Sequence, residues 1–312
     1  MTVDSGCRTD AGSVADMSRF SAGAAAIRCE PWDIGTGVAG YAWRAPNPKA
    51  VLLLQHGYGH YAHEYVHGNA ELIPHLLAMG VSVYAFDMWG NGRSPGMRGA
   101  TDIGQAVADH LAARRKLAEQ AETRSLPVFL FGHSVGGLVT VTSLLQDQSN
   151  LRGVILVSPT VTDPSPLVRA LARLGGALVP ARHVPGPPGK IELLTAVPEA
   201  RARLGRDSLY FRRVTWVTAA TASSIAHANW ERYREVRVPM LAVHGDADAT
   251  DPAGSRPLIK ALASTDKTLR LVPGGLHVLL EDTRREDVRG LIVDWIRARI
   301  PPSPSGSTAS AR

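Results

Sequence analysis

The chain has 312 residues, 45% of them hydrophobic, which is long enough to bury a full core as one α/β domain with an insertion. Its formal net charge of +6 does not indicate a nucleic-acid partner, because the arginines are dispersed and form no basic runs with interleaved aromatic residues. The two cysteines, Cys7 and Cys29, show no metal-ligand spacing and are compatible with a reducing cytoplasm.

The two ends of the chain differ from the rest in composition. Residues 1–26 are small, polar and slightly acidic, and they lack the basic start and apolar stretch of a secretory signal. Residues 301–312 are rich in proline and serine. We interpret 1–26 as a disordered leader and 301–312 as a disordered tail. No run of about 18 apolar residues occurs, so we expect a cytoplasmic protein without a membrane span.

From Ala50 onward, short apolar runs alternate with longer amphipathic stretches. This alternation predicts an α/β fold with a mostly parallel central sheet and helices on both faces, because right-handed crossovers join parallel strands. The segment 27–43 is expected to add an antiparallel edge hairpin. The expected core strands are 51–55, 81–86, 128–131, 154–157, 240–243 and 268–272, and the expected helices are 64–79, 103–122, 135–146, 253–263 and 284–299.

The alternation fails between about Thr160 and Glu235, where prolines punctuate short helical pieces. We interpret 161–235 as an inserted helical cap between two pieces of one core domain, 27–160 and 236–300. This stretch holds eleven Arg or Lys against six Asp or Glu. Most of the excess positive charge of the chain is therefore expected on the cap.

The sequence Gly132-His133-Ser134-Val135-Gly136 lies between an expected strand and an expected helix. A nucleophile elbow has this context, because glycines two residues either side of the serine let strand and helix approach closely. The serine then takes a strained backbone conformation that lifts its hydroxyl clear of the sheet. The pattern predicts that Ser134 is a catalytic nucleophile.

A serine nucleophile needs a base and a third group that orients the base. Among eleven histidines, only His277 follows the last expected strand, in a glycine-rich loop. His244 also follows a strand but precedes the acidic loop, and we interpret it as structural. The acid is expected after the strand at 240–243, where Asp246, Asp248 and Asp251 are all candidates.

Several motifs in the correct order resemble the monoacylglycerol lipase and lysophospholipase branch of the α/β-hydrolases, a group of serine aminopeptidase S33 type. The similarity covers about 50–161 and 238–295, with the cap only loosely similar. It implies an α/β-hydrolase fold, no cofactor, and a serine hydrolase that cleaves a small-molecule carboxylic ester of lipid-like type through an acyl-enzyme. The motifs that carry the resemblance are 56–59, 87–94, 132–137, 239–248, 266–269 and 277–279.

The resemblance also assigns the remaining site residues. It places the catalytic aspartate at Asp248, with Asp246 at a variable position, and it implies an oxyanion hole made by the backbone amides of Tyr58 and Val135. Two departures lie nearby: Tyr58 stands where the family usually has a small residue, and His60-Tyr61 replaces a Glu-His pair. These changes bear on substrate identity.

A competing pattern is His63-Glu64-Tyr65-Val66-His67, which spells a zinc-peptidase motif. Gly68 follows at once, and the longer form of the motif is absent. We interpret this segment as a solvated helix face and expect no bound metal.

Other functional alternatives share the fold. A specialised natural-product acyl hydrolase or acyl transferase would need the same triad, and a noncatalytic scaffold would not need to retain it. Epoxide hydrolases and dehalogenases use an aspartate nucleophile, which Ser134 argues against. Proline aminopeptidases would favour acids in the cap, whereas this cap is basic.

Other residues receive structural interpretations. We expect Asp87, in the turn after the second core strand, to accept hydrogen bonds from backbone amides. Two roles are open for the aromatic residues of the cap, lining of the acyl pocket or packing within the cap, and we favour packing. These residues are Tyr210, Phe211, Trp216 and Trp230.

A leucine stripe lies in the cap at near-helical spacing, beside three arginines. We favour the interpretation that it packs on the main domain. The alternative is that part of it stays exposed and makes peripheral contact with anionic lipid surfaces. The stripe comprises Leu167, Leu171, Leu174, Leu178 and Val179, with Arg169, Arg173 and Arg182 beside it.

Overall fold

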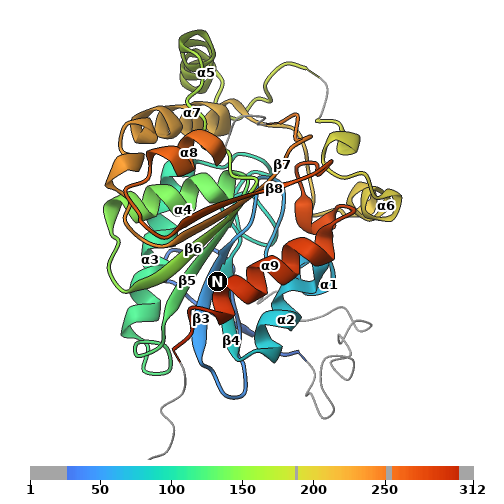
Figure 1. Cartoon of the computed structure of the whole chain (residues 1–312). Coiled ribbons are helices and arrows are strands. Elements are labelled where there is room, and N and C mark those ends of the chain that lie inside the picture. Colours follow the sequence, from blue (N-terminus) through green and yellow to red (C-terminus); the bar gives the residue numbers. More distant parts are fainter. Residues whose placement is uncertain (1–26, 187–188, 251–254, 302–312) are drawn as a thin grey trace, which may run out of the picture.

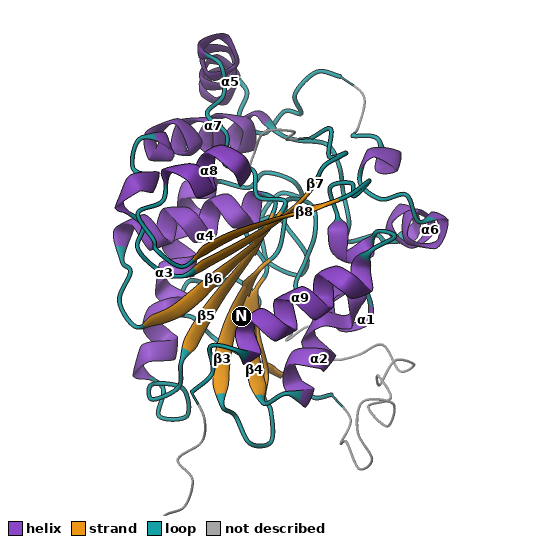
Figure 2. Ribbon diagram, viewed as in Figure 1, coloured by secondary structure: helices purple, strands orange, loops and turns teal. Residues whose placement is uncertain are grey.

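The computed structural model describes residues 27–186, 189–250 and 255–301 of the chain, so the expected leader and nearly all of the expected tail lie outside the described residues. These residues form an eight-stranded sheet in the order β1-β2-β4-β3-β5-β6-β7-β8 (Figure 2). The strands from β4 to β8 run parallel, and β2 pairs antiparallel with both β1 and β4. The predicted fold class is confirmed.

Each of the six expected core strands is present, and the expected edge hairpin is the pair β1 and β2. Their near-continuous runs of Val, Leu, Ile and Phe are typical of parallel strands that are covered on both faces. The strands are β1 Cys29–Pro31, β2 Gly40–Trp43, β3 Ala50–Gln55, β4 Val81–Phe86, β5 Val128–His133, β6 Leu151–Val157, β7 Met240–Gly245 and β8 Lys267–Val272.

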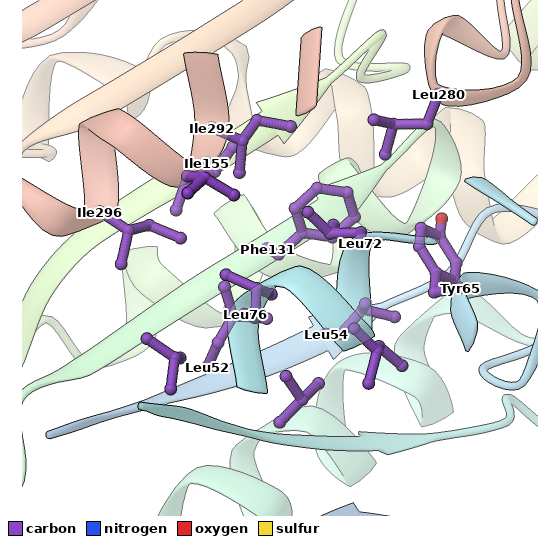
Figure 3. Packing of buried hydrophobic residues seen from close by; sticks show 14 of the residues in the cluster. Leu52, Leu54, Tyr65, Leu72, Leu76, Phe131, Ile155, Leu280, Ile292 and Ile296 are labelled. Atoms are coloured by element: carbon purple, nitrogen blue, oxygen red, sulfur yellow. The ribbon is translucent and has the colours of Figure 1, made fainter. Parts of the chain in front are cut away.

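Helices cover both faces of the sheet (Figure 1). One face packs against α3 Ile103–Glu119, α4 Val135–Gln146 and α8 Ser255–Ala261. The other packs against α1 Glu64–His67, α2 Leu72–Ala78 and α9 Arg285–Arg297. Alternate strand residues supply the two cores: Leu52 and Leu54 point toward α2 and α9 in Figure 3, whereas Val51 and Leu53 belong to the opposite core.

The first crossover helix, expected at 64–79, is broken. A 3-10 turn, Asn69–Glu71, separates α1 from α2, and its three residues have φ values of 49°, 55° and 53°. Pro74 has no amide hydrogen and its ring would clash with the preceding turn, so a continuous helix through it is disfavoured. Pro74 instead lies in the first turn of α2, where these costs vanish.

The expected cap segment 161–235 contains α5 Pro166–Leu178, α6 Pro198–Arg206 and α7 Trp216–Trp230, with 3-10 turns at Ile191–Leu193 and Tyr233–Glu235. The helix α7 is attached to the core, because Thr218 Oγ1 accepts from Thr101 N at 3.0 Å and Asn229 Nδ2 donates to Thr142 Oγ1 at 2.7 Å. The helix α5 lies on α7 at the outer end of the molecule (Figure 1). Gly175 and Gly176 permit this contact, since a Cβ at either would meet Trp216 or Ala220.

Among the helices built from described residues, none is long and apolar enough to cross a membrane. The cytoplasmic location stays a prediction from the sequence.

Asp87 holds the turn after β4 in place, as expected. Its buried carboxylate accepts from Ala62 N at 2.8 Å, Arg93 N at 2.9 Å and the Tyr41 hydroxyl at 2.9 Å. The Ala62 amide belongs to the loop after β3, which carries Tyr58 and His60. Asp87 therefore ties that loop to the neighbouring strand.

We expect Asp87→Ala to lower the free energy of unfolding by about 3 kcal/mol, because three buried donors lose their acceptor. For a chain of 312 residues the melting temperature should fall by roughly 5 °C, measured by calorimetry. The control is Asp294→Ala, whose exposed carboxylate pairs only with Arg297 at the surface and should change stability by less than about 0.5 kcal/mol. Equal melting temperatures of the two variants would contradict the assigned role of Asp87.

Candidate active site

Ser134 occupies the sharp turn between β5 and α4, with φ 53° and ψ −122°. Its amide donates to Val157 O at 3.0 Å and its carbonyl accepts from Thr160 N at 3.0 Å, so β6 holds the turn from the side. A Cβ on Gly132 would lie 2.7 Å from Gly136 O, and one on Gly136 would lie 2.4 Å from His56 O. The two glycines thus permit the close approach that the elbow pattern requires.

The three residues expected to form a triad lie together at the carboxyl ends of the parallel strands. His277 Nε2 is 2.8 Å from Ser134 Oγ, and His277 Nδ1 is 2.7 Å from Asp248 Oδ2. All three side chains are buried. Ser134 follows β5, Asp248 follows β7 and His277 follows β8, so residues separated by more than a hundred positions meet at one edge of the sheet.

Asp248 is held by more than the histidine. The Thr250 amide and hydroxyl donate to Asp248 Oδ1 at 2.8 and 2.6 Å, and His244 Nε2 lies 3.2 Å from Oδ2. Burial by itself raises the pKa of this carboxyl, but hydrogen bonds from His244, His277 and Thr250 outweigh it and keep the pKa well below its usual range. Asp248 is therefore ionised and can stabilise a positive charge on His277.

Asp246, another candidate acid, makes a different contact. Asp246 is exposed, and its Oδ1 accepts from Gly274 N at 2.7 Å, which fixes the loop that leads to His277. Asp251 lies outside the described residues. The geometry thus brings Asp248 to the expected place of the orienting acid and gives Asp246 a structural contact.

Tyr58 and Val135, whose backbone amides are the expected oxyanion donors, both line the cavity beside Ser134. No hydrogen bond between the described residues uses either amide. The Tyr58 hydroxyl lies 2.8 Å from Gly99 O in the core and 2.9 Å from Arg213 O in the cap segment, and it can donate to either carbonyl. The larger side chain at this position is therefore held by a hydrogen bond.

A cavity of about 280 Å³ lies between the strand ends and the cap segment. Ser134, His277, Tyr58 and Val135 are part of its wall. The cap supplies an apolar wall, and the loop after β3 supplies His60. The apolar lining residues are Leu194, Phe211, Val214, Ala219 and Ala222.

His60 and Glu64 form a second buried imidazole–carboxyl pair beside the cavity, with Nδ1 and Oε2 separated by 2.5 Å. Burial raises the pKa of Glu64, and the His60 contact offsets part of this shift. The ring of His60 lies between those of Tyr210 and His133, at centroid distances of 4.9 and 5.5 Å. Burial, together with His60 and His277, holds the pKa of His133 well below its usual range.

Several residues near the nucleophile were not predicted as part of a site. Tyr210 and Phe211, which we expected to serve packing, line the cavity. His244 was interpreted as structural, but it contacts the catalytic candidate Asp248. Thr250 was not considered, although a hydroxyl two residues after an aspartate can turn back to its carboxylate. That spacing is the one signal the sequence offered for it.

The zinc-peptidase pattern does not assemble a ligand set. His63 packs edge-on against the rings of Tyr41 and Trp43, at centroid distances of 4.5 and 5.2 Å, and burial lowers its pKa to about 4. Glu64 is bonded to His60 instead of facing a metal position. Among the described residues, no group of three or more His, Cys, Asp or Glu side chains could hold a metal ion.

Comparison with known proteins identifies a family that the chain matches. The model of the family described as serine aminopeptidase, S33, matches residues 46–284. The chain belongs to this family of α/β-hydrolases. The match spans both parts of the expected core as well as the cap segment between them, and it confirms the resemblance found in the sequence.

Two curated relatives and one solved structure are close to the chain. A monoacylglycerol lipase of Mycolicibacterium smegmatis is 28% identical over 80% of this chain and 89% of its own length. A phospholipase of Bacillus subtilis is 30% identical, covering 80% of this chain and 95% of its own. The crystal structure of a monoacylglycerol lipase from Paleococcus ferrophilus superposes with a TM-score of 0.73 at 28% identity, covering 83% of this chain and 99% of that one.

The two aspartates can be separated by single substitutions. We expect Asp248→Asn to lower kcat for a soluble ester by about 10³- to 10⁴-fold, because the amide cannot hold His277 in the required tautomer or stabilise its charge. Asp246→Asn keeps an acceptor for the Gly274 amide and should change kcat by less than about threefold. Steady-state kinetics of both variants provide the measurement. A larger loss in Asp246→Asn would reverse the assignment.

Proposed function

We propose that the protein is a serine hydrolase that cleaves carboxylic esters of the monoacylglycerol or lysophospholipid type. The observation that carries the proposal is the hydrogen-bonded series Ser134 Oγ, His277 and Asp248, which opens into a cavity with an apolar wall. Ester hydrolysis is the chemistry named for the relatives described above.

The proposed reaction has two steps. His277 Nε2 accepts the Ser134 proton as Oγ attacks the ester carbonyl, and His277 then returns that proton to the leaving alcohol, which leaves an acyl-enzyme. In the second step His277 takes a proton from water as the water oxygen attacks the acyl carbonyl. His277 then returns that proton to Ser134 Oγ as the bond between Oγ and the acyl carbon breaks and the acid leaves. Asp248 accepts from Nδ1–H throughout and stabilises the imidazolium that forms.

The negative charge of each tetrahedral intermediate develops on the former carbonyl oxygen. We propose that the backbone amides of Tyr58 and Val135 stabilise this charge by donating hydrogen bonds to the oxygen. Neither amide has another acceptor among the described residues. Val135 is also the first residue of α4, so the positive end of the helix dipole faces the same place. One such donor typically contributes about 3 to 4 kcal/mol to lowering the barrier.

The cavity supports an ester with an apolar acyl group and a polar alcohol part. Leu194, Phe211, Val214 and the α7 alanines offer apolar contact for the acyl chain. The polar ring of His60 lines the same cavity and can contact the alcohol part. A specialised acyl hydrolase would use the same triad on a different ester, and an acyl transferase would pass the acyl group to an acceptor other than water. Turnover of a panel of esters distinguishes these alternatives from the proposed function.

Ser134→Ala is expected to lower kcat/KM by more than about 1,000-fold, because the nucleophile is lost, while the melting temperature stays within a few degrees of wild type. In the wild-type enzyme a fluorophosphonate probe should label Ser134 alone, as read by mass spectrometry. Labelling elsewhere, or full activity in Ser134→Ala, would overturn the proposed mechanism. A panel of monoacylglycerols, lysophospholipids and p-nitrophenyl esters tests the substrate class. No turnover with Ser134 still labelled would favour the specialised alternative.

The proposal includes peripheral contact with lipid surfaces through α5. The leucine stripe does not pack on the main domain: Leu167, Leu174 and Leu178 are 68, 58 and 70% exposed. The residues that α5 buries are Ala172 and Gly175, which face α7. The interpretation that we favoured from the sequence is thus wrong for these leucines, because the small residues of the helix make its contact with the protein.

The charge of the cap segment favours an anionic surface. Arg173 and Arg182 lie in or just after α5, and neither has an ion-pair partner among the described residues. An exposed apolar face beside such cations is typical of helices that lie in a lipid interface, where apolar burial supplies affinity and the cations add attraction.

Changing Leu171 and Leu174 to serine is expected to lower activity on anionic lipid dispersions by about tenfold or more, because apolar burial in the interface is lost. Activity on short soluble esters and the melting temperature should remain near wild type, since both side chains are exposed. Liposome sedimentation should weaken as salt rises, because charge attraction is screened over about 8 Å at physiological ionic strength. Parallel loss of both activities, or no liposome binding, would contradict the lipid contact.

A further inference from the structure

Asp282 is a buried carboxylate near the triad that the proposed mechanism does not use. It is 1% exposed and lies five residues after His277. Its Oδ2 accepts from Leu276 N at 2.7 Å, and its Oδ1 accepts from Ala196 N at 2.8 Å. Leu276 directly precedes His277, whereas Ala196 belongs to the cap segment. One carboxylate therefore joins the loop that carries His277 to the cap.

Two more hydrogen bonds run in parallel with this bridge. The amide of Val278, directly after His277, donates to Leu194 O at 2.8 Å, and Thr195 Oγ1 donates to Glu281 O at 2.8 Å. We call residues 194–196 the cap strap. The strap is thus bonded directly to Val278, Glu281 and Asp282, which all follow His277, and Asp282 links it to Leu276 on the other side of His277. Leu194, the first residue of the strap, also lines the cavity.

The strap and the histidine loop depend on each other energetically. None of the ion pairs between described residues involves Asp282, so its buried charge is compensated mainly by the two amides. A buried carboxylate that loses one of its hydrogen bonds pays the desolvation of that oxygen. Moving the strap away would leave Oδ1 without its donor, and moving the loop away would do the same to Oδ2. Displacing either segment therefore carries the desolvation cost of one Asp282 oxygen.

We propose that Asp282 is a positioning residue that makes the orientation of His277 depend on the seating of the cap strap. The inference rests on the proposed function, in which His277 is the base. The contact between His277 Nε2 and Ser134 Oγ is 2.8 Å, and a displacement of about 1 Å in such a contact can cost about 10²-fold in rate. A substrate that touches Leu194 in the cavity contacts the same strap. The position of the cap strap thereby affects the position of the catalytic base, in addition to the role of the cap in enclosing the site.

The test compares Asp282→Asn with the matched control Asp287→Asn, which changes an exposed acid of α9 that pairs with Arg284. The asparagine keeps the size of Asp282, but its amide nitrogen cannot accept from one of the two backbone amides. We expect Asp282→Asn to lower kcat on a short p-nitrophenyl ester by about 10- to 100-fold with KM changed less than about threefold. The second-order rate of fluorophosphonate labelling at Ser134 should fall by the same factor. Asp287→Asn should match the wild type in both measurements.

Thr195→Val provides a second variant, which keeps the Asp282 carboxylate and removes the hydroxyl that donates to Glu281 O at 2.8 Å. This hydroxyl also lies 3.5 Å from Asp282 Oδ1 and accepts from Val197 N at 3.0 Å. The variant should lower kcat and the labelling rate in the same direction. In the double variant the losses should be less than multiplicative, because both substitutions release the same contact. If Asp282→Asn does not fold, Thr195→Val with wild-type kcat and labelling overturns the inference.

Three other results decide against the coupling. Wild-type labelling and kcat in Asp282→Asn would overturn it, and so would losses that follow only the fraction of unfolded protein. Fully multiplicative losses in the double variant would show two independent effects. Activity that persists in Ser134→Ala would instead contradict the proposed function itself, so the two failures are distinguishable.

Discussion

The left-handed turn at Ser134 is the constraint on which the rest of the site depends. A serine at φ 53° is sterically strained, and the surrounding contacts keep it there: β6 bonds its amide, and glycines at 132 and 136 let α4 lie against β5 and the loop after β3. The turn directs Oγ toward His277 and sets the first amide of α4 beside it. Without this turn, Asp248 and His277 would still lie at the strand ends, but Ser134 Oγ would not be placed within hydrogen-bond distance of His277.

Buried carboxylates then fix the parts that meet at that point. Asp248 holds the histidine ring, Asp87 ties the loop with Tyr58 and His60 to β4, and Asp282 binds the histidine loop to the cap strap. Asp87 and Asp282 are bonded largely to backbone amides, which gives definite positions to loops that would otherwise be free to move. The site is therefore built on the rigid sheet and held together by directed hydrogen bonds.

The cap segment has two chemically different parts. The helix α7 and the strap are bonded to the core and close the cavity, whereas α5 touches the rest of the protein mainly through small residues and leaves its leucines exposed. This division explains how one insertion can enclose an apolar substrate and also present an apolar, basic face outward. The lipid-surface proposal concerns the outer part, and the proposed coupling to His277 concerns the inner part.

The sequence by itself determined the α/β fold and the six core strands, and it predicted a cap at 161–235 and a nucleophile at Ser134, because apolar periodicity and elbow glycines are local signals. It left three aspartates open as the acid until family resemblance favoured Asp248, and it did not indicate the contacts of Thr250 and Asp282 or the pairing of His60 with Glu64. Tertiary structure brings Asp248 to His277 and Asp246 to the Gly274 amide, and the spacing of the two residues does not reveal these contacts. Tertiary structure also decided that the leucines of α5 are exposed. Periodicity shows that these leucines share one face of the helix, but which face packs on the protein depends on residues elsewhere in the chain.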